Sequence, residues 1–173
     1  MTDGSATACA TPAGAIEIRR VPITHPDAVR LIDEVQAEYV ARYGGPDETP
    51  IEPAMFEPPE GAFFVGYVDG RPLVSGAWRR SGAEAFGTTE TAEVKRMYVA
   101  PAGRGAGHAR RMLAHLEESA RAAGFAAVVL ETGLAQPEAI ALYESSGYLP
   151  VTPFGHYRCA PMSRCYGKLL TAG

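Results

Sequence analysis

A glycine-rich run at residues 99–109, Val-Ala-Pro-Ala-Gly-Arg-Gly-Ala-Gly-His-Ala, is the clearest candidate for chemistry in this chain. The pattern predicts a strand that ends in a tight turn and passes directly into a helix. The first backbone N–H groups of a helix have no partner within it and lie at the positive end of its dipole. Because glycines let such a backbone approach a pyrophosphate closely, the run is a candidate diphosphate site. Arg104, Arg110 or Arg111 could add charge-assisted contacts.

The same glycines have a simpler explanation. Gly103, Gly105 and Gly107 would also suit a sharp strand-to-helix turn with no ligand. Two other nucleotide motifs do not match: a P-loop needs GxxxxGK followed by Ser or Thr, and a dinucleotide fingerprint needs GxGxxG early in a parallel sheet. The glycines alone leave the choice between a bare turn and a diphosphate site open.

The histidines and cysteines do not form a recognisable site. His108 and His115 lie seven residues apart, with no carboxylate or thiolate at metal-binding spacing, so we expect no metal. Cys165 has no evident His and acid partners, and we expect it to be a small buried hydrophobe. Cys9, Cys159 and Cys165 lack paired spacing, which favours free thiols in a reducing compartment, most simply the cytoplasm.

The elements that must position the glycine run begin with a helix. Apolar residues recur at helical spacing from residue 28 to 39, after a start signal at 24–27, and Gly44 stands just past the last turn. Residues 45–61 are acidic and proline-rich, which predicts an irregular segment with at most one short helix near 54–56. Runs at 62–68 and 73–79 predict two antiparallel strands joined by Asp69-Gly70, a dipeptide suited to hairpin turns.

The glycine run lies inside a predicted strand–helix–strand unit. Residues 91–99 form a third strand, residues 107–123 carry an amphipathic stripe that ends at Gly124, and residues 126–130 are continuously apolar. This order predicts a right-handed crossover with two parallel strands. A helix from Pro137 to about residue 146 and extended pieces near 148–151 and 165–170 follow. The fold class is therefore α+β, with a mostly antiparallel sheet.

Length, net charge and hydropathy limit the number of domains and the classes of partner. The 173 residues fit one domain, which we expect at 15–173 after a disordered tail at 1–14. A net charge of -4 gives no general attraction for nucleic acid. No stretch is long and apolar enough to span a bilayer, so we expect no membrane partner. The oligomeric state stays open, with a homodimer among the possibilities.

Two motifs in this frame resemble the GNAT acetyltransferases. Residues 93–99, Glu-Val-Lys-Arg-Met-Tyr-Val, are followed by 104–109, which fit that family's acetyl-CoA loop: Arg104, Gly107 and Ala109 fill its three fixed places. About thirty residues later, 136–148 resemble the family's next motif. One small departure is Gln136, where many members carry Asn.

The resemblance implies a fold and a cosubstrate. The expected fold is a mixed, mostly antiparallel sheet of about six to seven strands, flanked by about four helices, in which a central parallel pair splays at a bulge and admits the pantetheine arm of acetyl-CoA. By resemblance, backbone groups near Met97, Tyr98 and Val99 meet the thioester and pantetheine, and those of the loop hold the pyrophosphate. The expected cofactor-binding residues are Met97, Tyr98, Val99, Arg104, Gly105, Ala106, Gly107, His108, Ala109 and Gln136.

The resemblance also suggests an acid and a base. An acceptor amine is almost wholly protonated at neutral pH, so a base or water chain is expected. Glu93, on the same strand face as Met97, is the first candidate and Glu131 the reserve; Glu93 could instead simply pair with Lys95 or Arg96. Tyr143 matches the family's tyrosine that protonates the departing thiolate, although it could equally be a core residue.

The expected reaction is transfer of the acetyl group of acetyl-CoA to a primary amine, by direct attack in a ternary complex. The acceptor is expected to be a small molecule or amino acid, in a pocket walled by residues 44–61 and 152–164. Its charged loop residues could attract a cationic amine, or Arg79, Arg80 or Arg158 could hold a carboxylate. The alternatives are a protein lysine or N-terminal acetyltransferase, or a non-catalytic acyl-CoA sensor.

Overall fold

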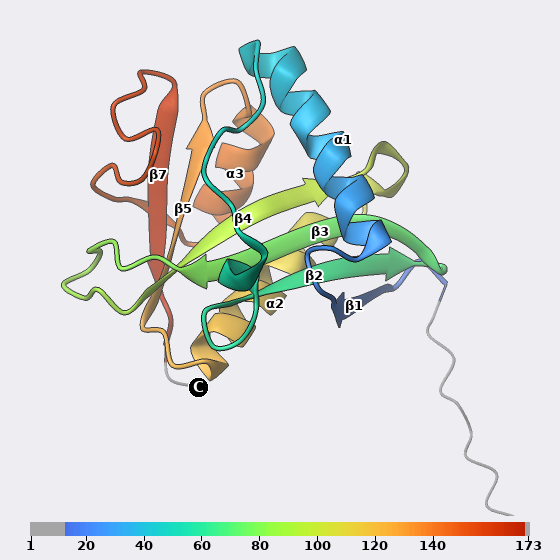
Figure 1. The fold of residues 1–173 in the computed structure, drawn as a ribbon, viewed down its shortest axis with the longest axis horizontal. Coiled ribbons are helices and arrows are strands. Elements are labelled where there is room, and N and C mark those ends of the chain that lie inside the picture. Colours follow the sequence, from blue (N-terminus) through green and yellow to red (C-terminus); the bar gives the residue numbers. More distant parts are fainter. Residues whose placement is uncertain (1–12, 172–173) are drawn as a thin grey trace, which may run out of the picture.

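A computed structural model describes residues 13–171 of the chain. One mixed sheet of seven strands, in the order β1-β2-β3-β4-β5-β7-β6, runs through the described part (Figure 1). Its strands are β1 (Ile16–Arg20), β2 (Gly61–Val68), β3 (Arg71–Arg80), β4 (Thr91–Val99), β5 (Ala127–Gly133), β6 (Leu149–Pro150) and β7 (Ser163–Leu169).

The β2–β3 hairpin turns where the sequence predicts. Asp69 and Gly70 both have a positive φ, 49° and 77°, and the two strands pair antiparallel around them. A two-residue turn of this hand matches the twist of the flanking strands, which is why Asp-Gly is favoured here. β3 continues to Arg80 and forms the antiparallel neighbour of β4.

The strand–helix–strand prediction is confirmed. β4 and β5 are parallel, and α2 (His108–Ala122) connects them. Their pairing covers only Thr91–Val94 with Ala127–Leu130, after which the two strands no longer pair. Antiparallel pairs surround this short parallel contact, so the sheet is mixed and mostly antiparallel as expected.

A bulge in β4 accompanies the separation of the two strands. Ser75 pairs with Tyr98 and Ala77 with Lys95, so Gly76 of β3 faces two residues of β4, Arg96 and Met97. Arg96 has a φ of 55°, and the Ser75 hydroxyl donates a 2.8 Å hydrogen bond to its carbonyl oxygen. An extra residue of this kind bends a strand and increases its local twist.

Helices cover both faces of the sheet. In Figure 1, α1 (Pro26–Tyr43) and the segment at 44–60 cross the near face, and α2 and α3 (Pro137–Ser145) lie behind the sheet. The described residues form three α-helices, which roughly fits the expected four. They also contain two short 3₁₀ helices, η1 (Pro53–Phe56) and η2 (Pro101–Gly103). The expected short helix near 54–56 is η1.

Apolar side chains on both faces form one core. Leu31 of α1 and Met112 and Leu116 of α2 are fully buried against the strands. On the α2 face, a Cβ added to Gly76 would lie 2.8 Å from the Met112 side chain, so this glycine allows the helix to approach the sheet. The core fixes α2, and with it the glycine run, against the end of β4.

Some features differ from the sequence prediction or lie beyond what is described. β1 is an additional strand, and β6 is only two residues long where the sequence predicts a longer piece at 148–151. Residues 1–12 of the expected tail, with Cys9, are outside the described range. Within 13–171, no helix has the length and apolar character needed to cross a membrane.

Candidate active site

A cavity of about 930 Å³ opens where β4 and β5 separate. Its wall combines α1, the start of the segment at 44–60, the bulged part of β4, the glycine loop (residues 103–109), the end of β5, α3 and the loop before β7. Most of the predicted site residues line it: Met97, Tyr98, Val99, Arg104, Gly105, Gly107, His108, Ala109, Gln136 and Tyr143. Ala106 and Glu93 are the two that do not.

The glycine loop has the backbone that a diphosphate site needs. Gly105 and Gly107 have φ values of 83° and 77°, and a Cβ added to either would meet no atom within 4 Å. Gly107 is the N-cap of α2, and no side chain caps this helix. The first N–H groups of α2 are therefore left for an anionic ligand. By contrast, a Cβ added to Gly103 would lie 3.3 Å from the side chains of Leu73 and Val99, so this glycine serves close packing.

The three arginines near the loop make different contacts. Arg104 donates to the Val99 carbonyl at 2.9 Å and pairs with Glu38 of α1, and it lines the cavity. Arg110 points to α3, where it donates to the hydroxyls of Ser145 and Ser146 at 2.8 and 2.9 Å. Arg111 donates to the Ala106 carbonyl at 3.3 Å. Of the three, Arg104 is the one that lines the cavity.

The separated strand offers a second set of backbone groups. Beyond Val94, β4 keeps β3 on one side but has lost β5 on the other. Unpaired polar groups of a strand edge can bind an extended ligand as a further strand would. Met97, Tyr98 and Val99 belong to this part and line the cavity, so their backbone fits the amide-bearing pantetheine arm that the resemblance implies.

Glu131, near the end of β5, is one of several carboxyl groups that line the cavity, and the charge of Lys95 acts on it. Burial raises its pKa to about 7, while the positive charge of Lys95 acts in the opposite direction. A carboxyl group with this pKa can accept a proton near neutral pH.

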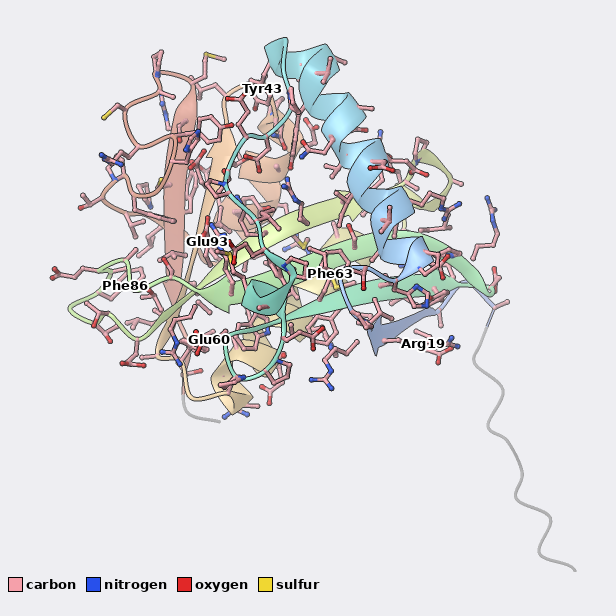
Figure 2. All side chains as sticks on the ribbon, viewed as in Figure 1. Arg19, Tyr43, Glu60, Phe63, Phe86 and Glu93 are labelled. Carbon is pink, nitrogen blue, oxygen red and sulfur yellow. The ribbon has the colours of Figure 1, made fainter. Side chains whose placement is uncertain are left out.

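Glu93 lies in a network of ion pairs outside the cavity wall. Its carboxylate lies 3.1 Å from Arg79 Nε and 3.8 Å from Lys95 Nζ, and only 8% of the residue is exposed. The Lys95 pairing weighed in the sequence thus occurs, and Arg79 is a second partner. Figure 2 shows Glu93 on the sheet behind the segment at 44–60. Arg79 further donates to the Pro50 carbonyl, so Glu93 helps to hold that segment.

Tyr143 lies in α3 and lines the cavity although the residue is only 6% exposed. Burial raises the pKa of its phenol above the usual range, so the hydroxyl remains a proton donor at all working pH values. Its ring packs 5.7 Å from that of Tyr148. Tyr148 donates to Glu117 at 3.1 Å and is not part of the cavity wall, so it serves packing.

Gln136 lines the cavity but is already engaged. Its side-chain amide donates to the hydroxyl of Tyr43 at 3.2 Å, and it provides no side-chain cap for α3. Tyr43 stands at the end of α1, where the segment at 44–60 begins (Figure 2). Gln136 therefore joins α3 to α1 at the rim of the cavity.

The predicted pocket walls are correct in part. Gly44 to Glu48 and four residues between 157 and 163 line the cavity, and the Glu48 N–H donates to the Tyr157 hydroxyl at 2.7 Å. The remainder of the acidic segment, and the arginines Arg79, Arg80 and Arg158, do not line it.

Several cavity residues were not predicted from the sequence: Tyr39, Arg42, Tyr43, Lys95 and Arg96. Tyr39 and Tyr43 lie one turn apart at helical spacing, which could have marked the sheet-facing side of α1. For Arg96 no local signal exists, because its orientation depends on the bulge. Within residues 13–171, no group of three or more His, Cys, Asp or Glu is arranged to hold a metal ion.

Comparisons with known proteins agree with this geometry. The model of the acetyltransferase (GNAT) family matches residues 29–148. A protein named IAA acetyltransferase from Azospirillum brasilense is 35% identical over 135 residues, which cover 78% of this chain and 85% of that protein. The uncharacterized N-acetyltransferase YjgM of Escherichia coli K12 is 32% identical over 130 residues, 72% of this chain and 75% of YjgM.

A solved structure extends the likeness over nearly the whole fold. A proposed acyl-CoA N-acyltransferase from Klebsiella pneumoniae superposes with a TM-score of 0.72 at 27% identity. The match covers 90% of this chain and 98% of the Klebsiella chain.

Proposed function

Since this chain belongs to the GNAT acetyltransferase family and is an acyltransferase that uses an acyl-CoA cosubstrate, we propose that it transfers the acetyl group of acetyl-CoA to the primary amine of a small molecule. One observation carries the proposal: a single cavity joins the uncapped start of α2, the open edge of β4, Glu131 and Tyr143. One continuous wall thus offers helix N–H groups for a diphosphate, a strand edge for an extended arm, and two side chains that can exchange protons near a reacting carbonyl.

The proposed chemistry divides between backbone and side chains. The N–H groups of the glycine loop hold the diphosphate, and Arg104 adds charge. A backbone N–H near Met97 or Tyr98 stabilises the negative oxygen that forms as the amine attacks the thioester carbonyl, a contribution of about 3 to 4 kcal/mol for one such donor. Acetyl-CoA itself supplies only the activated acyl group.

Two side chains move protons in this proposal. Glu131 accepts a proton from the acceptor ammonium, directly or through water, and so exposes the nitrogen lone pair. The nitrogen then bonds to the carbonyl carbon, and Tyr143 donates its phenolic proton to the thiolate sulfur as the carbon–sulfur bond breaks. The nitrogen loses its second proton to form the neutral amide, and that proton, carried by water, restores the phenol. Glu93, the base first expected from the sequence, instead supports the wall through its pairs with Arg79 and Lys95.

The enclosure supports a small acceptor. Glu48 and Tyr157 come from segments far apart in the sequence, and their hydrogen bond joins two walls of the cavity. A protein substrate needs an open groove for the chain around its lysine. The acetyltransferase name of the Azospirillum relative also supports acetyl transfer. A cytoplasmic location is part of the proposal, since Cys159 and Cys165 are free thiols.

The test is an acceptor screen. Purified protein is incubated with acetyl-CoA and a panel of small primary amines, lysine peptides and no acceptor, and thiol release is followed beside thermal stabilisation by coenzyme A. We expect thiol release that depends on a small amine. Release with lysine peptides alone would contradict the small acceptor, and stabilisation without any release would contradict turnover.

A further inference from the structure

Arg96 lines the cavity, and one edge of its guanidinium group has no hydrogen-bond partner among the described residues. Its Nη1 donates to Asp47 Oδ2 at 2.9 Å. Its Nε is buried and has no hydrogen-bond partner among the described residues, and Nη2 makes no hydrogen bond there either. Nε and Nη2 form the side of a guanidinium that binds a carboxylate with two parallel hydrogen bonds. The side chain is only 4% exposed, and leaving such a buried donor unpaired costs stability.

The bulge in β4 is what brings this side chain to the cavity. Neighbouring residues of a regular strand point to opposite faces, so Lys95 and Arg96 should diverge. Instead both reach the same Asp47 oxygen, at 3.5 and 2.9 Å. The φ of 55° at Arg96 allows this, in a region that side chains other than glycine rarely occupy. A strained backbone that presents a buried arginine to a cavity indicates a ligand-binding role.

Once Glu131 has taken a proton, the charged groups near Arg96 carry one net positive charge. Arg79, Lys95 and Arg96 carry three positive charges, and their ion-pair partners Asp47 and Glu93 carry two negative ones. Asp47 occupies the Nη1 end of Arg96, and Lys95 shares that carboxylate. Glu131 lines the same cavity and faces Lys95. A ligand that carried only a positive charge would leave the Nε–Nη2 edge unmatched.

We propose that the acceptor is an amino carboxylate such as a free amino acid, whose carboxylate binds the Nε–Nη2 edge of Arg96 while its amine faces Glu131. This inference rests on the proposed function and narrows its acceptor. Arg79, Arg80 and Arg158, the carboxylate partners considered from the sequence, do not line the cavity, whereas Arg96 does. The acceptor is thus held by its acid group at one point and reacts at its amine.

Matched acceptors test the inference in the native protein. Each free amino acid is compared with its own carboxamide, which has the same side chain and amine but no carboxylate. The amine of the amide is less basic, so without recognition the amide should react at least as fast. We expect the acid to be preferred in kcat/KM by about 10-fold to 100-fold, the range of a charge-assisted pair.

Arg96 variants assign the preference to this side chain. Arg96→Lys keeps the positive charge but removes the two parallel N–H donors of the guanidinium edge, and Arg96→Asn places a residue that tolerates the positive φ. For each, we expect the acid-to-amide ratio of kcat/KM to fall toward one, mainly through the KM of the acid. Calorimetric titration with coenzyme A shows whether the cavity remains intact, and the native acid and amide comparison stands even if a variant fails to fold.

The outcomes separate the inference from the function on which it rests. Amides acetylated as well as their acids by native protein would overturn the carboxylate acceptor and leave amine acetylation standing. A strong acid preference that survives in a folded Arg96→Lys protein would overturn the role of Arg96. No thiol release with any acid, amide or simple amine would overturn the proposed function, and the inference with it.

Discussion

The ammonium form of an amine cannot attack a thioester, so a group in the cavity must remove one proton before the reaction can begin. Glu131 suits this role because burial raises its pKa to about 7, which leaves a substantial ionised fraction at neutral pH. Below that value the carboxyl group is protonated and cannot act as a base. The rate should therefore depend on pH in a way that reports Glu131.

The pH profile is the first prediction. If Glu131 deprotonates a bound ammonium, kcat/KM of the native protein rises about tenfold per pH unit below about 7 and then levels off. The Glu131→Gln variant can use only the acceptor that is already deprotonated in solution. Its kcat/KM therefore keeps rising with pH up to the pKa of the acceptor amine, and at pH 7 it is about 100-fold lower than that of the native protein. Initial rates of thiol release from pH 5.5 to 9 measure both curves. Identical profiles would rule out Glu131 as the base.

The same carboxyl group affects stability, which gives a second prediction. Its pKa is raised from 4.5 to about 7 in the folded protein, so the native state binds the proton more tightly than the unfolded chain. The free energy of unfolding should fall as pH rises from about 4.5 through about 7. Glu131→Gln should lose this dependence and gain stability relative to the native protein above pH 7. Denaturant unfolding at pH 5 and pH 8 tests this.

The third prediction concerns the hydroxyl group of Tyr143. Tyr143→Phe removes only the hydroxyl that would protonate the leaving thiolate, so we expect kcat to fall about 100-fold or more while the affinity for coenzyme A is unchanged. Tyr148→Phe is the matched control: it removes a buried phenol from the adjacent ring, which binds Glu117 instead of lining the cavity. Equal losses in the two variants, or loss of coenzyme A binding in Tyr143→Phe, would return Tyr143 to a packing role.

The sequence identified both candidate bases but ranked Glu93 ahead of Glu131. Alternation along the strand brings Glu93 and Lys95 to one face, and both Glu93 and Glu131 were candidates for the base. The pairing of Arg79 opposite Glu93 across β3 and β4 depends on strand register. Register is set by the whole sheet, so the sequence did not reveal that an arginine already engages Glu93.

At the scale of elements, the site exists because two strands stop pairing and a helix begins without a cap. The separation of β4 and β5 after Val94 exposes one edge of β4, and the start of α2 at Gly107 exposes helix N–H groups. Both features present backbone groups, which explains why small residues dominate the glycine loop. A side chain added at these positions would compete with the ligand for space.

A glycine substitution in the loop is the fourth prediction. Gly107→Ala meets no protein atom, so its stability cost should be only the backbone strain, about 1 kcal/mol. Its methyl group and the altered φ should nevertheless weaken coenzyme A binding by at least about tenfold, or 1.4 kcal/mol. Gly70→Ala, in the β2–β3 turn, has the same φ of 77° and the same open surroundings. Calorimetry that shows equal affinity in the two variants would contradict the loop as the diphosphate site.

Elements with strong local signals were predictable, and those formed by tertiary contacts were not. The Asp-Gly hairpin, the amphipathic α2 and the apolar β5 each carry their pattern within a few residues, and all three are confirmed. The bulge at Arg96 has no local signature, because a residue other than glycine takes a positive φ there only under the constraint of β3. β6 pairs through only two residues, too few for a periodic pattern.

At the scale of the molecule, the cavity is closed by contacts between segments distant in the sequence. Arg42 of α1 pairs with Glu138 of α3, Arg104 of the glycine loop pairs with Glu38 of α1, and the Glu48 N–H donates to Tyr157. The segment at 44–60 is the longest irregular part of this enclosure, and it carries Asp47, the partner of Arg96. Its attachment to the sheet should therefore influence both folding and the acceptor site.

Gly61 makes that attachment, and its replacement is the fifth prediction. It begins β2 directly after the segment, and an added Cβ would overlap the Met55 carbonyl oxygen and lie 2.6 Å from that of Trp78. Both atoms are backbone, so neither can move aside as a flexible side chain would. Gly61→Ala should lower the free energy of unfolding by about 1 to 3 kcal/mol, as other overpacked sites do.

Thermal unfolding measures the effect, because 1 kcal/mol corresponds to about 2 to 4 °C in a protein of this size. Gly45→Ala is the control for stability, since it lies in the same segment and its methyl group would meet nothing within 4 Å. If the strained junction also displaces Asp47, the folded Gly61→Ala protein should lose discrimination between acid and amide acceptors while it still binds coenzyme A. A Gly61→Ala protein as stable as Gly45→Ala would show that this junction does not hold the segment to the sheet.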